Sequence, residues 1–159
     1  KEIRGVGEVK AIQLACIGEL SARIWKAAAS EKNITFDAPS KVAAFYMEEM
    51  RHLEQENLKL LLLNTKNILL RDITVSRGTV NASCATPREI YIEALRFRAC
   101  GIILLHNHPS GDPTPSREDC LFTERVREAG SLMGVPLLDH IIIGDNSYVS
   151  LRERGIFET

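Results

Sequence analysis

Residues 101–119 read GIILLHNHPSGDPTPSRED, and this stretch carries the strongest indications of both fold and chemistry. The apolar run at 101–105 is typical of a buried strand, and His106 and His108 follow at its end. Because alternate residues on a strand project to the same side, both imidazoles are expected on one face of a sheet. Imidazole is the commonest protein ligand for metals, so the pair suggests a metal site.

The segment after the histidines contains four residues that oppose regular structure: Pro109, Gly111, Pro113 and Pro115. The chain must therefore turn away from the sheet before Ser116, where a helical pattern begins. Ser116 is suited to be the N-cap residue and Asp119 to occupy the third helical position. A loop of this kind can return Asp119 to the histidines. Two imidazoles, one carboxylate and an open position form the ligand set of a catalytic zinc ion.

Each half of this pattern also has a purely structural interpretation. Ser116 followed by Asp119 is a common helix start, and two histidines at a strand end can simply face solvent. Cys120, directly after Asp119, is an alternative ligand, although packing is the usual role of a free cysteine. The combination of both halves around a Pro/Gly loop favours the metal site.

The stretch resembles the metal motif of the JAB/MPN metalloprotease family (JAMM), which is His-x-His-Pro, six residues, Ser, two residues and Asp. The matching positions are His106, His108, Pro109, Ser116 and Asp119. With TPREIYIEAL upstream and LLDHIIIGD downstream, roughly residues 36–159 are similar to the bacterial RadC branch. The resemblance implies the MPN fold, a relative of the cytidine-deaminase architecture. It also implies one Zn²⁺ per chain and hydrolysis of peptide or isopeptide bonds in a peptide or protein substrate.

The resemblance assigns two further roles. A glutamate before the first strand is the catalytic base of the family, and Glu56 is the best positional match, with Glu54 as the alternative register. On its own, such a glutamate would be interpreted as a solvated charge. The Ser116 hydroxyl is expected to stabilise the oxyanion. RadC proteins often carry a histidine where this chain has Thr86, so no role is expected from that side chain.

Length and composition limit the classes of protein and of binding partner that are possible. The chain has 159 residues, a net charge of -1, 45% hydrophobic and 26% charged residues, which is typical of one soluble core with a small appendage. No global basic field is available to attract nucleic acid, and no apolar run is long enough to span a membrane. Four cysteines outside any Cys-x-x-Cys pair, and no visible leader, predict a cytoplasmic protein with reduced thiols.

Three parts are predicted along the chain. Residues 1–30 carry Gly5 and Gly7 ahead of an apolar helical pattern, similar to the second half of a helix-hairpin-helix that contacts the DNA backbone. A plain helix after a glycine turn is the alternative interpretation. Residues 31–39 are predicted to be a linker, and residues 40–159 to be the metalloprotease-like domain.

The hydrophobic pattern predicts an α/β fold with one mixed sheet flanked by helices. The expected helices span 40–52, capped by Ser40, then 88–98 and 116–133; the expected strands span 58–64, 68–75, 102–105, 137–143 and 148–149. His52 is expected to be exposed. His140 is interpreted as held by local hydrogen bonds rather than as a fourth ligand, because catalytic zinc keeps one open position.

Three functions are considered. The first is zinc-dependent amide hydrolysis, with Glu56 as the general base. The alternative is a DNA-associated repair accessory module that binds the phosphate backbone without hydrolysis, for which the Gly-x-Gly segment is the support. A zinc deaminase is disfavoured, because His108 stands where the glutamate of His-x-Glu would be and no Pro-Cys-x-x-Cys is present.

Overall fold

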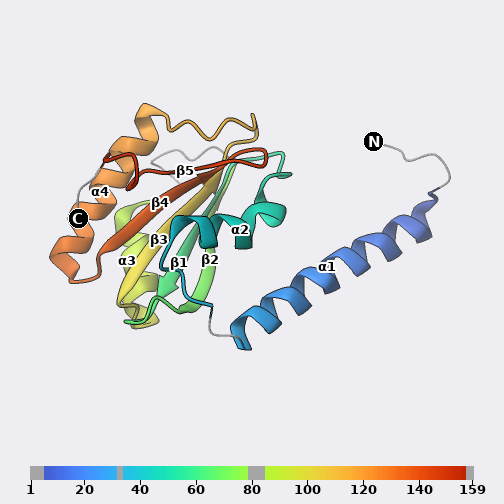
Figure 1. Ribbon diagram of the computed structural model, residues 1–159, viewed down its shortest axis with the longest axis horizontal. Coiled ribbons are helices and arrows are strands. Elements are labelled where there is room, and N and C mark those ends of the chain that lie inside the picture. The colour runs from blue at the N-terminus through green and yellow to red at the C-terminus, as the bar shows by residue number, and fades with distance from the viewer. Residues whose placement is uncertain (1–5, 32–33, 79–84, 157–159) are drawn as a thin grey trace. The chain divides into compact units, whose positions relative to one another are not determined.

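A computed structural model of the chain describes residues 6–31, 34–78 and 85–156. The chain divides into two compact units, Lys1–Ile34 and Thr35–Thr159, which are described separately. Helix α1 (Glu8–Glu31) is the element of the first unit, and Gly7 directly precedes it (Figure 1). Gly5 lies outside the described residues, so the predicted Gly-x-Gly turn stays a prediction.

Helix α1 carries a series of exposed apolar side chains: Val9, Ile12, Leu14, Ile17, Leu20 and Ile24. The helix runs to Glu31, one residue into the predicted linker, and the next helix begins at Pro39. Residues 32 and 33 of that linker lie outside the described residues. None of the helices in the described ranges combines the length and apolar character needed to span a bilayer.

The second unit is built on a five-stranded mixed sheet with the strand order β2-β1-β3-β4-β5. In chain order the strands are β1 (Asn57–Leu63), β2 (Leu69–Arg77), β3 (Gly101–Asn107), β4 (Leu137–Ile143) and β5 (Tyr148–Ser150). Strands β3 and β4 are parallel, and the other neighbouring pairs are antiparallel. The predicted fold class, a mixed sheet flanked by helices, is therefore confirmed.

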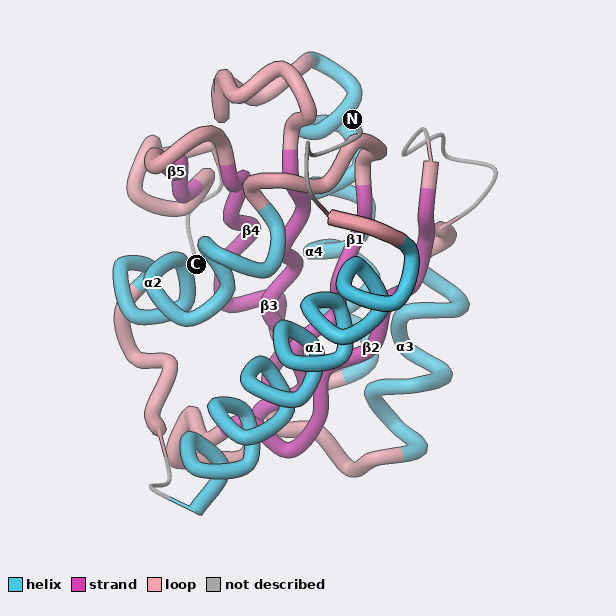
Figure 2. The backbone as a smooth tube through the Cα atoms, turned by 90° about the vertical axis from the view of Figure 1, so that its right-hand side faces the viewer, coloured by secondary structure: helices cyan, strands magenta, loops and turns pink. Residues whose placement is uncertain are grey.

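Helices cover both faces of this sheet. Helix α2 (Pro39–Met50) lies on one side of the strands, and α3 (Pro87–Arg96) and α4 (Arg117–Met133) lie on the other (Figure 2). Both crossovers, β2 to β3 through α3 and β3 to β4 through α4, move in the same direction across the sheet. Right-handed connections therefore place α3 and α4 on the same face. Covered on both sides, residues 58–63 of β1, which are apolar except for Lys59, and every residue of β3 are buried.

Helices α3 and α4 approach closely at one point. The Tyr91 hydroxyl of α3 donates a hydrogen bond to the backbone carbonyl of Val126 in α4, at 2.9 Å. Gly130 of α4 lies beside the same tyrosine: a Cβ there would lie 3.1 Å from Tyr91 Cζ and 2.7 Å from the carbonyl oxygen of Val135. Glycine at this position therefore permits the close helix contact.

Several predicted element boundaries are wrong. Helix α2 begins at Pro39 with Ala38 as its N-cap, and not at Ser40, because proline is favoured in the first helical position where no amide hydrogen is needed. Strand β2 extends to Arg77 rather than to residue 75, because its whole length pairs with β1. Ile68, predicted to begin that strand, instead forms an isolated bridge with Thr35.

Candidate metal centre

The carboxyl end of β3 presents His106 and His108 on the same side of the sheet, as the alternation predicts. Their Nε2 atoms are 3.0 Å apart. The His106 side chain is fully buried, whereas that of His108 is 15% exposed. The pair therefore combines one ring inside the core with one at the surface.

The loop after β3 returns the chain to the histidines through the start of α4. Ser116 is the N-cap: its Oγ accepts from the Asp119 amide at 3.1 Å, and Asp119 Oδ2 accepts from the Ser116 amide and hydroxyl, both at 2.7 Å. The predicted cap is confirmed. Asp119 Oδ1 lies 3.3 Å from His106 Nε2 and Oδ2 lies 3.5 Å from His108 Nε2. One carboxylate therefore caps the helix and faces both histidines.

Glu56, the residue directly before β1, extends its side chain to the same site. The antiparallel register pairs Leu58 with His106, so the start of β1 lies beside the end of β3. Glu56 Oε1 is 3.6 Å from His108 Nε2 and 3.9 Å from His106 Nε2. Glu56, His106, His108 and Asp119 each offer a ligand atom, and these atoms all lie within 4.8 Å of one another.

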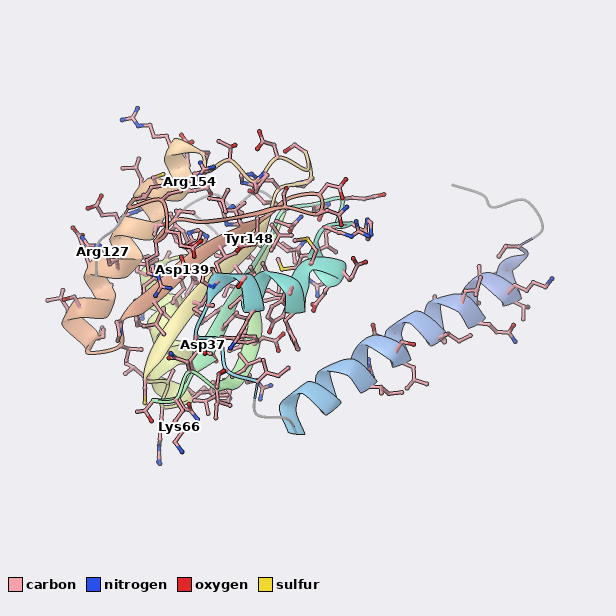
Figure 3. The ribbon with its side chains drawn as sticks, viewed as in Figure 1. Asp37, Lys66, Arg127, Asp139, Tyr148 and Arg154 are labelled. Carbon is pink, nitrogen blue, oxygen red and sulfur yellow. The ribbon has the colours of Figure 1, made fainter. Side chains whose placement is uncertain are left out.

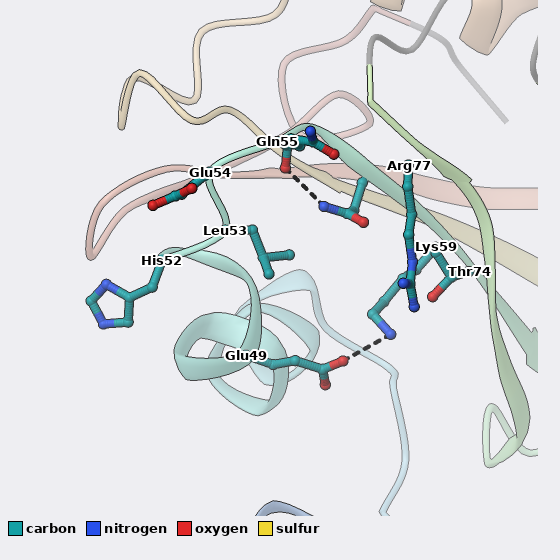
Figure 4. A pocket seen from close by; sticks show the side chains of 9 residues that line it. Glu49, His52, Leu53, Glu54, Gln55, Lys59, Thr74 and Arg77 are labelled. Atoms are coloured by element: carbon teal, nitrogen blue, oxygen red, sulfur yellow. Dashed lines mark hydrogen bonds and ion pairs between the residues drawn. The ribbon is translucent and has the colours of Figure 1, made fainter. Parts of the chain in front are cut away.

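The other candidates lie elsewhere. Glu54 is exposed and lines a groove of about 620 Å³ between α2 and β2, together with the exposed His52 (Figure 4). In the same groove Lys59 pairs with Glu49 at 2.8 Å. Cys120 is half-buried and is not a member of the four-residue group. Of the two possible registers, the geometry favours Glu56 over Glu54.

Asn107, between the two histidines, holds the segment that carries Glu56. Because side chains alternate on a strand, it points away from them. Its Oδ1 accepts from the Asn57 amide at 2.9 Å, and its Nδ2 donates to the carbonyl of Gln55 at 3.1 Å. The sequence analysis missed this role, since nothing local to Asn107 shows that β1 lies beside it.

The electrostatics of the four residues are those of a site that attracts a cation. A hydrogen bond with Asp119 raises the pKa of His108, against the effect of its burial, whereas burial lowers the pKa of His106 to about 4. Burial works to raise the pKa of Asp119, but contacts with His108, His106 and Ser116 outweigh it and hold that pKa well below its usual range. The carboxylate is therefore ionised.

The donor set fits a zinc ion. His108 Nδ1 lies 2.8 Å from the backbone carbonyl of Asp112, which can only accept, so in the neutral ring the proton is on Nδ1 and the lone pair on Nε2. That lone pair faces the oxygens of Asp119 and Glu56, and such a cluster of acceptors is stabilised by a cation. Nitrogen and carboxylate ligands suit Zn²⁺.

Behind His106 lies a further polar network in the core. His140, fully buried on β4, has its Nε2 atom 2.7 Å from His106 Nδ1. Its Nδ1 atom lies 2.6 Å from Thr123 Oγ1, and the Thr123 hydroxyl donates to the carbonyl of Asp119 at 2.6 Å. Hydrogen bonds hold His140, as predicted, but these two partners lie on other elements and are not local in the chain. Burial holds the pKa of His140 well below the usual value. The sequence analysis missed the part played by Thr123.

The neighbouring Asp139 has a structural role. It is buried within the sheet unit (Figure 3) and accepts from the Ser150 hydroxyl and the His140 amide, both at 2.7 Å. A third hydrogen bond comes from the Arg152 amide at 3.2 Å. Burial raises the pKa of Asp139, while these hydrogen bonds oppose the shift. Asp139 thus fixes β4, and with it His140, against the turn that follows β5.

Comparison with known proteins agrees with this geometry. The family model described as "RadC-like JAB domain" matches residues 36–156. A "UPF0758 protein" from Clostridium botulinum (strain Langeland) is 49% identical over 156 residues, which cover 97% of this chain and 67% of that protein. A "UPF0758 protein" from Halalkalibacterium halodurans is 51% identical over 153 residues, covering 96% of this chain and 66% of that protein.

The fold, the four-residue site and these matches define a JAB-type domain. The chain belongs to the RadC-like JAB domain family. It spans about two thirds of the length of the relatives named above. The family resemblance derived from the sequence is thereby confirmed.

Proposed function

We propose that this domain is a zinc-dependent hydrolase of amide bonds in peptide or protein substrates, including isopeptide bonds. The observation that carries the proposal is the convergence of Glu56, His106, His108 and Asp119, whose ligand atoms come from three separate segments. His106, His108 and Asp119 would hold the metal. Of the other three residues, Glu56 lies farthest from the His106 Nε2 atom, and its 25% exposed side chain stays available as a base.

Zinc bound to such ligands polarises a carbonyl and lowers the pKa of a bound water to about 7. Glu56 would accept a proton from the attacking water and donate it to the leaving amine, because its carboxylate faces the ligand cluster and reaches solvent.

Ser116 is proposed to stabilise the oxyanion. Its side chain is exposed next to the ligands, but its single hydroxyl proton is directed to Asp119 Oδ2. The hydroxyl would have to turn toward the substrate oxygen for this role. A comparable donor contributes about 3 to 4 kcal/mol to other hydrolases.

Metal analysis of purified variants tests the site. We expect about one zinc per chain in the wild-type protein and in Glu56→Gln, because the amide keeps the shape of the side chain outside the ligand set. His108→Ala is expected to lose the metal. Stoichiometric zinc in the double His106→Ala, His108→Ala variant would contradict the assignment.

Hydrolysis is tested with the same proteins. Wild-type protein loaded with zinc is incubated with a mixed peptide library, and new termini are identified by mass spectrometry. Glu56→Gln, which retains zinc, is the matched control for contaminating proteases. Equal cleavage by the wild type and by Glu56→Gln would refute the role of Glu56 as the base.

A further inference from the structure

The hydrogen bonds behind His106 determine where its proton lies. Thr123 is the starting point, because a hydroxyl group has one proton to donate. Thr123 Oγ1 lies 2.6 Å from the backbone carbonyl of Asp119 and 2.6 Å from His140 Nδ1. A carbonyl oxygen can only accept, so the hydroxyl proton is directed to Asp119. Toward His140, Thr123 is therefore the acceptor.

The proton of His140 follows from this assignment. Its Nδ1 must carry the hydrogen that Thr123 accepts, so in the neutral ring the lone pair is on Nε2. Both ring nitrogens bond to uncharged partners, Thr123 and His106, in a fully buried position where a charged imidazole would be costly. His140 therefore offers an acceptor, and not a donor, toward β3.

The tautomer of His106 is the consequence. His140 Nε2 lies 2.7 Å from His106 Nδ1, so the hydrogen between them belongs to His106 Nδ1. The lone pair of His106 is then on Nε2, which is 3.3 Å from Asp119 Oδ1 and 3.0 Å from His108 Nε2. In the opposite tautomer a hydrogen would occupy this position, and no metal ion could bind to His106 there.

We propose that His140 and Thr123 are positioning residues that hold His106 in its metal-binding tautomer and orientation. The inference rests on the proposed metal centre. The network joins three elements, because Thr123 and Asp119 lie on α4, His140 on β4 and His106 on β3. The backbone of one ligand, Asp119, thus controls the ring nitrogens of another. His108 obtains the same tautomer independently, from the carbonyl of Asp112.

Proton positions can be measured in the metal-free full chain. Two-dimensional ¹⁵N–¹H spectra that correlate ring nitrogens with ring carbon-bound protons distinguish the two neutral tautomers of each histidine. The chain has four histidines, and single His→Gln variants assign their signals. We expect the proton on Nδ1 in both His106 and His140. A proton on Nε2 of either ring would overturn the inference, whether or not the protein binds zinc.

A matched pair of variants at Thr123 tests the consequence for the metal. Thr123→Val keeps the shape of the side chain but has no hydroxyl, whereas Thr123→Ser keeps the hydroxyl. We expect Thr123→Val to weaken zinc binding about 10- to 100-fold, as loss of a partner behind a ligand does in other zinc proteins. Thr123→Ser should restore most of the affinity, and Thr74→Val, at an exposed site on β2, should leave it unchanged.

Zinc affinity is measured by competition with a chromophoric chelator, and circular dichroism checks the fold. Wild-type affinity in a folded Thr123→Val protein would overturn the inference. If Thr123→Val does not fold, the wild-type proton positions still decide it. Absence of zinc binding by the wild-type protein would instead refute the proposed metal centre, so the two failures are distinguishable.

Discussion

The two histidines of the site are held by partners of different kinds. His108 donates to a backbone carbonyl, that of Asp112, which no substitution removes. His106 depends on the side chains of His140 and Thr123. Single substitutions can therefore disturb the binding geometry of His106 while that of His108 is kept. The buried half of the site is the half that is sensitive to mutation.

Protons are expected to compete with zinc mainly at His108. Because its hydrogen bond with Asp119 raises its pKa, His108 is mostly protonated in the metal-free protein below about pH 6.5. Burial lowers the pKa of His106 to about 4, so that ring is mostly neutral between about pH 5 and pH 6.5. Zinc binding requires an unprotonated imidazole, so the apparent affinity should fall about tenfold per pH unit below the pKa of His108.

Calorimetric titrations of zinc in two buffers with different ionisation enthalpies measure this proton. We expect close to one proton released per zinc between about pH 5 and pH 6, which is below the pH range in which a zinc-bound water would itself ionise. Release of no proton in the acidic range would contradict the expected state of His108. Release of two protons per zinc would contradict the expected neutral state of His106.

The close contact between α3 and α4 is expected to be sensitive to a single added methyl group. In Gly130→Ala the added methyl group meets the carbonyl oxygen of Val135 and the Tyr91 ring. Overpacking costs about 1 to 3 kcal/mol, whereas alanine gains about 1 kcal/mol over glycine in a helix. Loss of the Tyr91 hydrogen bond adds about 1 kcal/mol. We expect the free energy of unfolding to fall by about 1 to 3 kcal/mol.

Urea denaturation followed by circular dichroism measures the change. Gly18→Ala is the control, because a Cβ at Gly18 in α1 meets nothing within 4 Å. That variant should leave the unfolding of the sheet unit unchanged. If Gly130→Ala had the same free energy of unfolding as the wild type, α3 and α4 could move apart without destabilising the unit, which would contradict the prediction.

Local chemistry explains which elements the sequence could predict. Ser116 and Asp119 are three residues apart and satisfy each other, so the start of α4 is visible in the sequence alone. Ser40 was a wrong N-cap because the neighbouring Pro39 decided the helix start. The alternation of His106 and His108 likewise needed only the strand period.

Contacts between distant segments could not be predicted in this way. Thr123, His140 and Asn107 act through partners that the order and register of the strands bring close, and no local pattern encodes that register. The placement of Glu56 came from the family resemblance, and the pairing of β1 with β3 gives its physical basis. The residues that converge at the candidate metal centre were therefore predictable, while the groups that orient them were not.

The division into two units leads us to expect that the second unit binds zinc on its own. All four residues of the candidate metal centre belong to the unit Thr35–Thr159. A shortened chain of residues 35–159 is expected to bind zinc as tightly as the full chain and to unfold at a similar temperature. Chelator competition and scanning calorimetry compare the two proteins. Weaker zinc binding by the shortened chain would show that residues 1–34 contribute to the site.

Zinc should also stabilise this unit against unfolding. The proposed ligands would tie the end of β3 and the start of α4 together, so the ion would bind the folded chain in preference to the unfolded one. At a free zinc concentration of 100 times Kd, the expected gain is about 2.7 kcal/mol. Calorimetry with zinc and with chelator measures it. The His106→Ala, His108→Ala double variant should show no such difference.

The parallel pairing of β3 with β4 has an evolutionary consequence. Neighbouring parallel strands cannot be joined by a hairpin, so a crossover connection must run back along the sheet from β3 to β4. The loop after His108 is the first part of this connection. Near its tip the loop exposes the side chains of Ser110 and Thr114, while its bond to His108 uses only the main chain of Asp112. Residues at the rim can thus be exchanged over generations without moving the histidines, which in the proposed hydrolase would let selectivity drift while the chemistry is inherited unchanged.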